Sequence, residues 1–202
     1  MYSAPSIEEQ IVYVGKLLFK RRLMDISGGN ISCRSGVYIY MTPTGAGHQY
    51  HWNIPPQEIL CTHIDSDELL EHPKRSREAI SHLLVYRAYP TVRAIIHAHP
   101  IHVLPFCAAE RAIPAVIKSA QVFGAEFGFI EEKPEYSYEQ GEEIVARLQP
   151  LAGLLEQQAA ALLMPKHGVF IAAASLAYAV DCLECLDLNA YCVLAQKWLS
   201  QP

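Results

Sequence analysis

The sequence predicts a single α/β domain in which helices sandwich a central sheet. The chain has 202 residues, 51% of them hydrophobic and 18% charged, which is enough apolar material for one medium-sized core. Segments with helical spacing alternate with short β-branched runs, and no repeat, low-complexity tract or linker separates them. We therefore expect residues 1–202 to form one domain.

The N-terminal third is expected to contain a helix followed by a hairpin. Ser6-Ile7-Glu8-Glu9 has the form of a capping box, and the apolar residues behind it recur at helical spacing to about Leu23. Turn residues and short apolar runs then predict a hairpin, a second turn and a further strand. Their ranges are 31–34 and 37–41 for the hairpin, 42–45 for the turn and 59–64 for the strand.

The remainder of the chain is expected to alternate helices and strands. A second helix is predicted from Ser76 to about Ala88, because Pro90 prevents its continuation. Residues 110–137 mix proline, glycine and aromatic residues, so we expect strands and loops there. The other predicted elements are a strand over 92–98, helices over 101–109 and 138–148, strands over 160–164 and 169–173, and a final helix from Ser175, its cap, to about 199.

Charge and composition exclude several classes of protein. The formal net charge of −5 argues against a protein that binds nucleic acid, which needs a basic face. No apolar run is long enough to span a membrane, and the N-terminal residues carry acids where a signal peptide carries bases. The six cysteines are scattered, and Cys182 and Cys185 are expected to be packing residues of a helix. We therefore expect a cytoplasmic protein with reduced thiols.

Two of the nine histidines stand at the end of a predicted strand. In His97-Ala98-His99 the two imidazoles are two residues apart, so a strand directs them to the same face. Such a pair can chelate one ion, and Zn²⁺ accepts three or four nitrogen, oxygen or sulfur ligands. The motif is short, so two ordinary loop histidines remain the alternative.

Two further residues are candidates for the same site. His167 lies in a tight turn between two apolar strands, where a buried polar ring needs a partner, and is a candidate third ligand. Glu78 lies in the first turn of the helix predicted from Ser76, and is a candidate fourth ligand or base. The helix dipole there favours its carboxylate form, although an ordinary acid at a helix start is the alternative.

Three turns offer donors for an anion. Gly28-Gly29-Asn30 and Thr44-Gly45 present backbone N–H groups, and Ser76 adds a hydroxyl at a helix N-terminus. Together they indicate a phosphate site, whereas each one alone is most simply a turn.

Five segments occur together in one order. They are GGNISCR (28–34), MTPTG (41–45), RSREAISHLLVYRAYP (75–90), VRAIIHAHPIHV (92–103) and ALLMPKHGVFIA (161–172). From about residue 7 to 197, this pattern resembles the class II aldolase/adducin family, which includes the L-fuculose-phosphate aldolases. The resemblance implies a three-layer α/β/α sandwich with a central, mainly antiparallel sheet.

The resemblance also implies roles for residues. The implied metal ligands are His97, His99 and His167, and Glu78 takes the position of the catalytic base. The implied phosphate ligands are Asn30, Thr44, Gly45 and Ser76. Arg77 stands where family aldolases often have a second serine, and we expect its guanidinium to bind phosphate or carboxylate.

Two departures affect the part of the site that recognises the aldehyde. Lys118 aligns with a tyrosine that helps to protonate the product in the family aldolase. That enzyme also has a tyrosine in a tail beyond its last helix, and this sequence ends at Pro202.

The expected function is that of a metal-dependent aldolase, a lyase that cleaves a ketose 1-phosphate through a metal-stabilised enediolate. Zn²⁺ is the expected cofactor, with Mn²⁺, Co²⁺ or Fe²⁺ as alternatives. A dehydratase, epimerase or decarboxylase acting on a related sugar phosphate or sugar acid would use the same parts. A non-enzymatic, adducin-like interaction module is a third possibility, which the intact histidines and Glu78 oppose. The family resemblance further implies a homotetramer.

Overall fold

A computed structural model describes residues 4–199, so the chain end at Pro202 lies outside the described residues. The longer helices are α1 (Ile7–Lys20), α4 (Ala79–Ala88), α7 (Tyr138–Leu148) and α8 (Leu176–Leu199). The short helices are α2 (Ala46–Tyr50), α3 (Glu68–Glu71), α5 (Leu104–Ala108) and α6 (Lys118–Gln121), with 3₁₀ turns at Pro56–Glu58, Gln149–Leu151 and Leu154–Glu156. The strands are β1 (Asn30–Ser35), β2 (Tyr38–Met41), β3 (Leu60–His63), β4 (Ala94–Ala98), β5 (Ile113–Pro114), β6 (Glu126–Phe127), β7 (Ala159–Met164) and β8 (Gly168–Ala173).

Six of the strands form one antiparallel sheet in the order β3-β2-β1-β4-β8-β7. Every pair of neighbours in this sheet is antiparallel. β1 and β2 form the hairpin that the sequence predicted, and β7 and β8 form a second hairpin that closes around 165–167. In the register of β4, His97 lies opposite Asn30 of β1 and opposite Phe170 of β8. Two candidate site residues are thus cross-strand neighbours.

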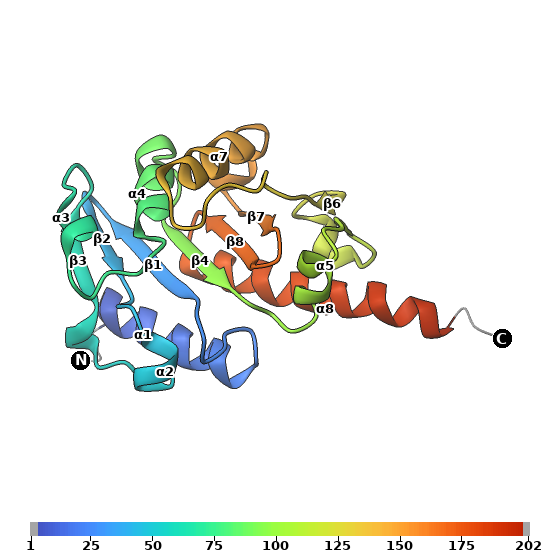
Figure 1. The fold of residues 1–202 in the computed structure, drawn as a ribbon, viewed down its shortest axis with the longest axis horizontal. Helices are drawn as coiled ribbons and strands as arrows, with labels where there is room; N and C mark the ends of the chain where they lie inside the picture. Colours follow the sequence, from blue (N-terminus) through green and yellow to red (C-terminus); the bar gives the residue numbers. More distant parts are fainter. Residues whose placement is uncertain (1–3, 200–202) are drawn as a thin grey trace.

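The sheet is the middle of three layers. Helices α4 and α7 cover one face, and α1 and α8 cover the other (Figure 1). The alternation along β4 divides the core accordingly: Ile96 packs in the cluster that contains α1 and α8, and Ile95 packs in the cluster that contains α4 and α7. The predicted α/β/α sandwich with an antiparallel central sheet is confirmed.

Local sequence signals fixed several boundaries correctly. The predicted capping box is present at α1, because Ser6 Oγ accepts from the Glu9 amide at 3.2 Å and Glu9 Oε2 accepts from the Ser6 amide at 2.7 Å. Helix α7 spans the predicted residues. Ser175 Oγ accepts from the Tyr178 amide at 3.2 Å, as expected of the cap of α8.

Other boundaries differ from the prediction. Helix α1 ends at Lys20 and does not reach Leu23. Helix α5 begins at Leu104, because residues 101–103 form turns after Pro100. The segment 110–137 contains the short helix α6 in addition to strands and loops, and α2 and α3 were not predicted. Such one-turn helices depend on tertiary contacts more than on local periodicity.

One correction bears directly on the site. The helix expected from Ser76 begins at Ala79, and Glu78 is its N-cap residue, with φ −89° and ψ 8°. Glu78 therefore precedes the first turn of α4, whereas the prediction had placed it within that turn. Among residues 4–199, no helix is long and apolar enough to cross a membrane. The described cysteines are free thiols, with Cys182 buried in α8 as expected.

Candidate active site

One cavity collects every residue that the sequence predicted for the site. Its volume is about 440 Å³, and it opens where β1 begins, β4 ends and α4 begins. The predicted residues that line it are Asn30, Thr44, Gly45, Ser76, Arg77, Glu78, His97, His99 and His167. We call the three histidines the metal half of the site. The anion half consists of Asn30, Thr44, Gly45, Ser76 and Arg77, and Glu78 belongs to neither half.

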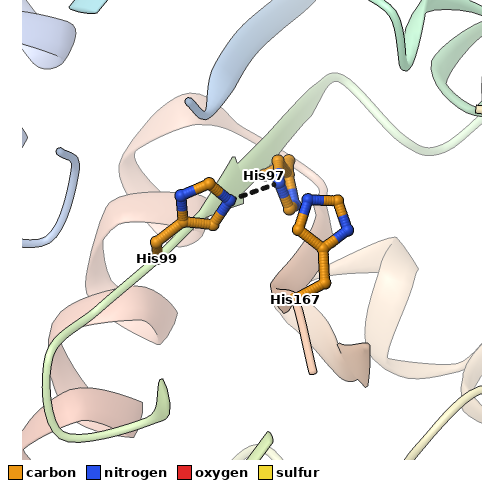
Figure 2. Close-up of side chains that lie close together, drawn as sticks. All are labelled: His97, His99 and His167. Atoms are coloured by element: carbon orange, nitrogen blue, oxygen red, sulfur yellow. Dashed lines mark hydrogen bonds between the residues drawn. The ribbon is translucent and has the colours of Figure 1, made fainter. Parts of the chain in front are cut away.

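The three imidazoles of the metal half converge on one point. Ring centroids lie 4.8 Å apart for His97 and His99, 4.7 Å for His97 and His167, and 5.4 Å for His99 and His167. One nitrogen from each ring lies within 4.8 Å of the others. Figure 2 shows the rings facing one another, two from the end of β4 and one from the turn between β7 and β8. This spacing fits three ligands of a single ion.

The turn that carries His167 approaches β4 unusually closely. A Cβ atom at Gly168 would lie 2.4 Å from the carbonyl oxygen of Ala98 and 2.7 Å from Cδ2 of His99. Only glycine permits this approach, and it places the preceding histidine beside the other two.

Hydrogen bonds orient two of the rings so that their Nε2 atoms face inward. His97 Nδ1 lies 3.1 Å from the carbonyl oxygen of Val169, and His99 Nδ1 lies 3.2 Å from Oδ2 of Asp25. Both partners are acceptors, which favours a proton on each Nδ1 and directs each Nε2 inward. The two Nε2 atoms lie 3.0 Å apart, within hydrogen-bond distance, with donor and acceptor set by the tautomers of the two rings. That spacing is close to the distance of about 3.3 Å between two nitrogens that share one tetrahedral Zn²⁺.

Burial favours the neutral form of two of these rings, His97 and His167. Burial is the largest cause that holds the pKa of His97 well below its usual value, and the neighbouring imidazoles add to it. The pKa of His167 is lowered for the same reasons, and its Nδ1 is buried without a hydrogen-bond partner. Neutral nitrogen donors with an unpartnered lone pair are the ligands that a divalent metal of the zinc type prefers.

Glu78 lies next to this cluster, almost fully buried. Its Oε2 accepts from Asn30 Nδ2 at 2.7 Å and lies 3.4 Å from His97 Nε2, whereas its Oε1 has no partner. Burial raises the pKa of Glu78 to about 7, and the hydrogen bond from Asn30 and the charge of Arg77 oppose part of that rise. A carboxyl group with a pKa near neutrality can both take up and release a proton.

The anion half is built more from side chains than we expected. The Gly28 amide donates to Asp25 Oδ1 at 2.9 Å, and the Thr44 amide donates to the carbonyl oxygen of Lys74 at 2.8 Å. These two amides therefore have protein acceptors and are not free for an anion, so a backbone cradle is left to the other amides of the two turns. Ser76 Oγ accepts from Asn30 Nδ2 at 3.0 Å, so its own hydroxyl proton is free to point elsewhere.

Comparison with known proteins gives the family. Residues 9–194 match the family described as the class II aldolase and adducin N-terminal domain. This chain belongs to the class II aldolase and adducin family. Class II aldolases are metal-dependent, and the histidine triad offers a place for the metal ion.

Individual members of the family are distant in sequence. An L-fuculose phosphate aldolase of Methanococcus vannielii is 24% identical over 179 residues, which cover 89% of this chain and 91% of that one. A 5-deoxy-D-ribulose 1-phosphate aldolase of Bacillus thuringiensis is 26% identical, over 54% of this chain and 50% of its own length. The structure of an L-fuculose-1-phosphate aldolase from Thermus thermophilus superposes with a TM-score of 0.76 at 21% identity, covering 95% of both chains. That similarity confirms the fold.

Sequence reasoning missed two cavity residues that touch members of the predicted set. Asp25 accepts from His99, from the Gly28 amide, and from the amide and hydroxyl of Ser27. Burial raises its pKa, but the Ser27 hydroxyl, the Gly28 amide and His99 outweigh burial and lower the pKa below its usual value. Tyr136 lies beneath the guanidinium of Arg77. Asp25 stands three residues before a predicted anion turn, which was a weak signal, whereas nothing in the sequence indicated Tyr136.

Lys118 has no place in the cavity of its own chain. It is the exposed first residue of α6, outside the residues that line the cavity. The described part of one chain therefore gives it no contact with the candidate site.

Proposed function

We propose that the chain is a metal-dependent aldolase that cleaves a ketose 1-phosphate, with His97, His99 and His167 as the ligands of the metal. The observation that carries the proposal is the meeting of three imidazoles, one buried carboxyl group and the anion half in a single cavity. A family member without catalytic function would have no need of that combination, so the adducin-like alternative is disfavoured.

A divalent cation at the triad would act as a Lewis acid that stabilises negative charge developing on the substrate oxygens. Zn²⁺ is the proposed ion, because three imidazole nitrogens suit it and leave a position for substrate, and Mn²⁺, Co²⁺ or Fe²⁺ are the alternatives. The hydrogen bonds from His97 to Val169 and from His99 to Asp25 hold the ligands in the correct tautomer.

Glu78 is proposed to transfer the proton at carbon. When the bond between C3 and C4 of the ketose breaks, the C4 hydroxyl releases its proton to solvent and becomes the aldehyde carbonyl, while C3 keeps the electron pair and must gain a proton. Glu78 supplies it in cleavage and removes it in the direction of condensation. Asn30 fixes the carboxyl group by its hydrogen bond to Oε2, and burial sets a pKa suited to this exchange.

The substrate class follows from the anion half together with the named relatives. One relative is named for L-fuculose phosphate and the other for 5-deoxy-D-ribulose 1-phosphate. The proposed phosphate ligands are Asn30, Thr44, Gly45, Ser76 and Arg77, all of which line the cavity. We propose that they hold the phosphate, and that the ketose extends from it toward the triad.

Two further predictions belong to this proposal. We propose that the protein is a cytoplasmic homotetramer. Exposed apolar side chains on α8, including Leu188 and Tyr191, offer material for contacts between copies. Light scattering of the purified protein measures the assembly directly.

The decisive experiment is a substrate screen with the zinc-loaded protein. A panel of ketose 1-phosphates is incubated with the protein, and released dihydroxyacetone phosphate is measured. Aldolase activity releases that triose phosphate together with an aldehyde. Consumption of a sugar phosphate without it identifies the dehydratase, epimerase or decarboxylase alternative. A protein that binds no metal and converts no substrate is the adducin-like module.

A further inference from the structure

A stacked pair of side chains at the cavity is not explained by the proposed chemistry. The guanidinium carbon of Arg77 lies 4.3 Å from the ring centroid of Tyr136, which is a cation–π contact. Both residues line the cavity, and each stands just before a helix, Arg77 before α4 and Tyr136 before α7. The same ring lies edge-on to His167, with centroids 6.1 Å apart. Tyr136 therefore lies between the anion half and the metal half.

The backbone at Tyr136 is held in an uncommon conformation by a buried anchor. Its φ angle is +63°, in the left-handed region that residues other than glycine rarely adopt. Its amide donates to Oε1 of Gln140 at 3.0 Å, and Gln140 is only 3% exposed. Ser137 caps α7 by accepting from the Gln140 amide at 3.1 Å. Strain that the surrounding structure holds in this way is typical of functional positions.

Close packing of two helices brings the pair together. Figure 1 shows α7 beside α4 on the same face of the sheet. A Cβ atom at Gly141 of α7 would lie 2.6 Å from Cδ1 of Leu84 and 3.3 Å from Cα of Ser81, so glycine allows the helices this approach. The loops that precede both helices are thereby brought together at the cavity.

The ring leaves the guanidinium available to an anion. Arg77 is exposed, and within residues 4–199 its guanidinium has no ion pair and no hydrogen bond, only the ring of Tyr136. A stacked guanidinium loses rotamer freedom before substrate arrives, while its N–H groups remain free for a bidentate pair with phosphate. Ser76, the next residue along the chain, belongs to the anion half. The arrangement is that of a preorganised phosphate clamp.

We propose that Tyr136 is a positioning residue that holds Arg77 for the phosphate, and that this stacked pair sets the preference for phosphorylated over unphosphorylated substrates. This inference rests on the proposed function for the identity of the substrate. Tyr136 contacts the proposed phosphate ligand Arg77, and it does not contact the phosphate itself.

The test is a double-mutant cycle on the zinc-loaded protein, with inorganic phosphate as the binding probe in calorimetry. Tyr136→Leu removes the ring, and Tyr136→Phe keeps the ring and removes only the hydroxyl. Arg77→Met removes the charge and keeps the chain length. Values of kcat and KM are then measured with L-fuculose 1-phosphate and with unphosphorylated L-fuculose.

We expect Tyr136→Leu to weaken phosphate binding about two- to fivefold and to raise KM by the same factor with kcat unchanged. Tyr136→Phe should behave like the wild type. Arg77→Met should weaken phosphate binding at least about tenfold, and adding Tyr136→Leu should weaken it no further. In Tyr136→Leu and Arg77→Met, kcat/KM should fall more with L-fuculose 1-phosphate than with unphosphorylated L-fuculose.

Three results would overturn the inference. The first is that Tyr136→Leu weakens phosphate binding equally in the presence and in the absence of Arg77. The others are an effect of Tyr136→Phe as large as that of Tyr136→Leu, or a Tyr136→Leu variant in which kcat falls and KM does not change. If Tyr136→Leu does not fold, Arg77→Lys serves instead, because it keeps the charge and loses the planar stack; wild-type phosphate affinity in that variant would also overturn it. Phosphate binding needs no turnover, so a wild-type protein that binds phosphate and cleaves no ketose phosphate refutes only the proposed function.

Discussion

The two halves of the candidate site differ in what holds them. In the metal half, His97 is 1% exposed on the central strand β4, between β1 and β8. In the anion half, Thr44 and Arg77 are exposed residues of loops that lead into helices. Strand register and burial fix His97 together with Asn30, the one residue of the anion half that lies on the sheet. Helix packing and a ring contact hold Arg77. The comparison teaches that the centre of the site rests on the sheet, while its exposed anion-binding residues rest on loops.

The largest expected effect comes from breaking the metal half. His97→Ala removes one of the three proposed ligands from a buried site, so we expect the loss of bound metal and activity at background. Elemental analysis of the purified variant measures the metal. His48→Ala alters an exposed histidine of α2 outside the cavity and should retain both. A His97→Ala protein with a full complement of zinc would refute the assignment of this ligand.

The next effect separates chemistry from metal binding. Glu78→Gln keeps the shape of the side chain and an oxygen that can accept from Asn30, but it cannot transfer a proton. We expect kcat to fall about 10²- to 10⁴-fold with metal content unchanged. Steady-state kinetics and elemental analysis on the same sample measure both quantities. Normal turnover would exclude Glu78 from the proton transfer.

A smaller effect tests the support beneath the metal half. In Asp25→Asn the amide group can donate to His99 Nδ1, which would favour the tautomer that protonates Nε2 and removes its lone pair. We expect metal affinity to fall about 10- to 100-fold, measured by competition with a chelator. Asp187→Asn is the matched control, because Asp187 pairs with His102 outside the cavity. Equal affinities for Asp25→Asn and wild type would contradict the role of Asp25.

The smallest effect should be confined to the anion half. Ser76→Ala removes one hydroxyl, and we expect KM for a ketose 1-phosphate to rise about tenfold while metal content stays the same. Ser81→Ala, on the neighbouring helix α4, removes a buried hydroxyl that has no partner and should leave KM unchanged. If Ser76→Ala instead released the metal, the two halves would not be independent, and the comparison would fail.

Local patterns predicted the elements that local forces determine. The capping box of α1, both ends of α7 and the hairpin of β1 and β2 depend on residues close in sequence, and the structure has them. The start of α4 was misplaced by three residues, because a serine followed by helix-forming residues resembles a cap. The structure instead uses Ser76 to contact Asn30, and the helix begins only after Glu78.

Contacts between distant segments were beyond local patterns. Asp25 supports His99 from 74 residues away, and Tyr136 stacks on an arginine from another loop. No periodicity links such residues. Local patterns also could not show whether a turn amide already has a hydrogen-bond acceptor. The amides of Gly28 and Thr44 donate to acceptors that the fold supplies.

The sequence by itself determined which donors exist and where along the chain they stand: two histidines at a strand end, one in a turn, one acid before a helix. The tertiary structure alone decided that they meet, which nitrogen of each ring faces inward, and that burial shifts the pKa of Glu78 to about 7 and that of His97 well below its usual value. The reason is physical. Backbone preferences act over a few neighbouring residues, whereas distance between side chains and exclusion of water are properties of the whole packed molecule.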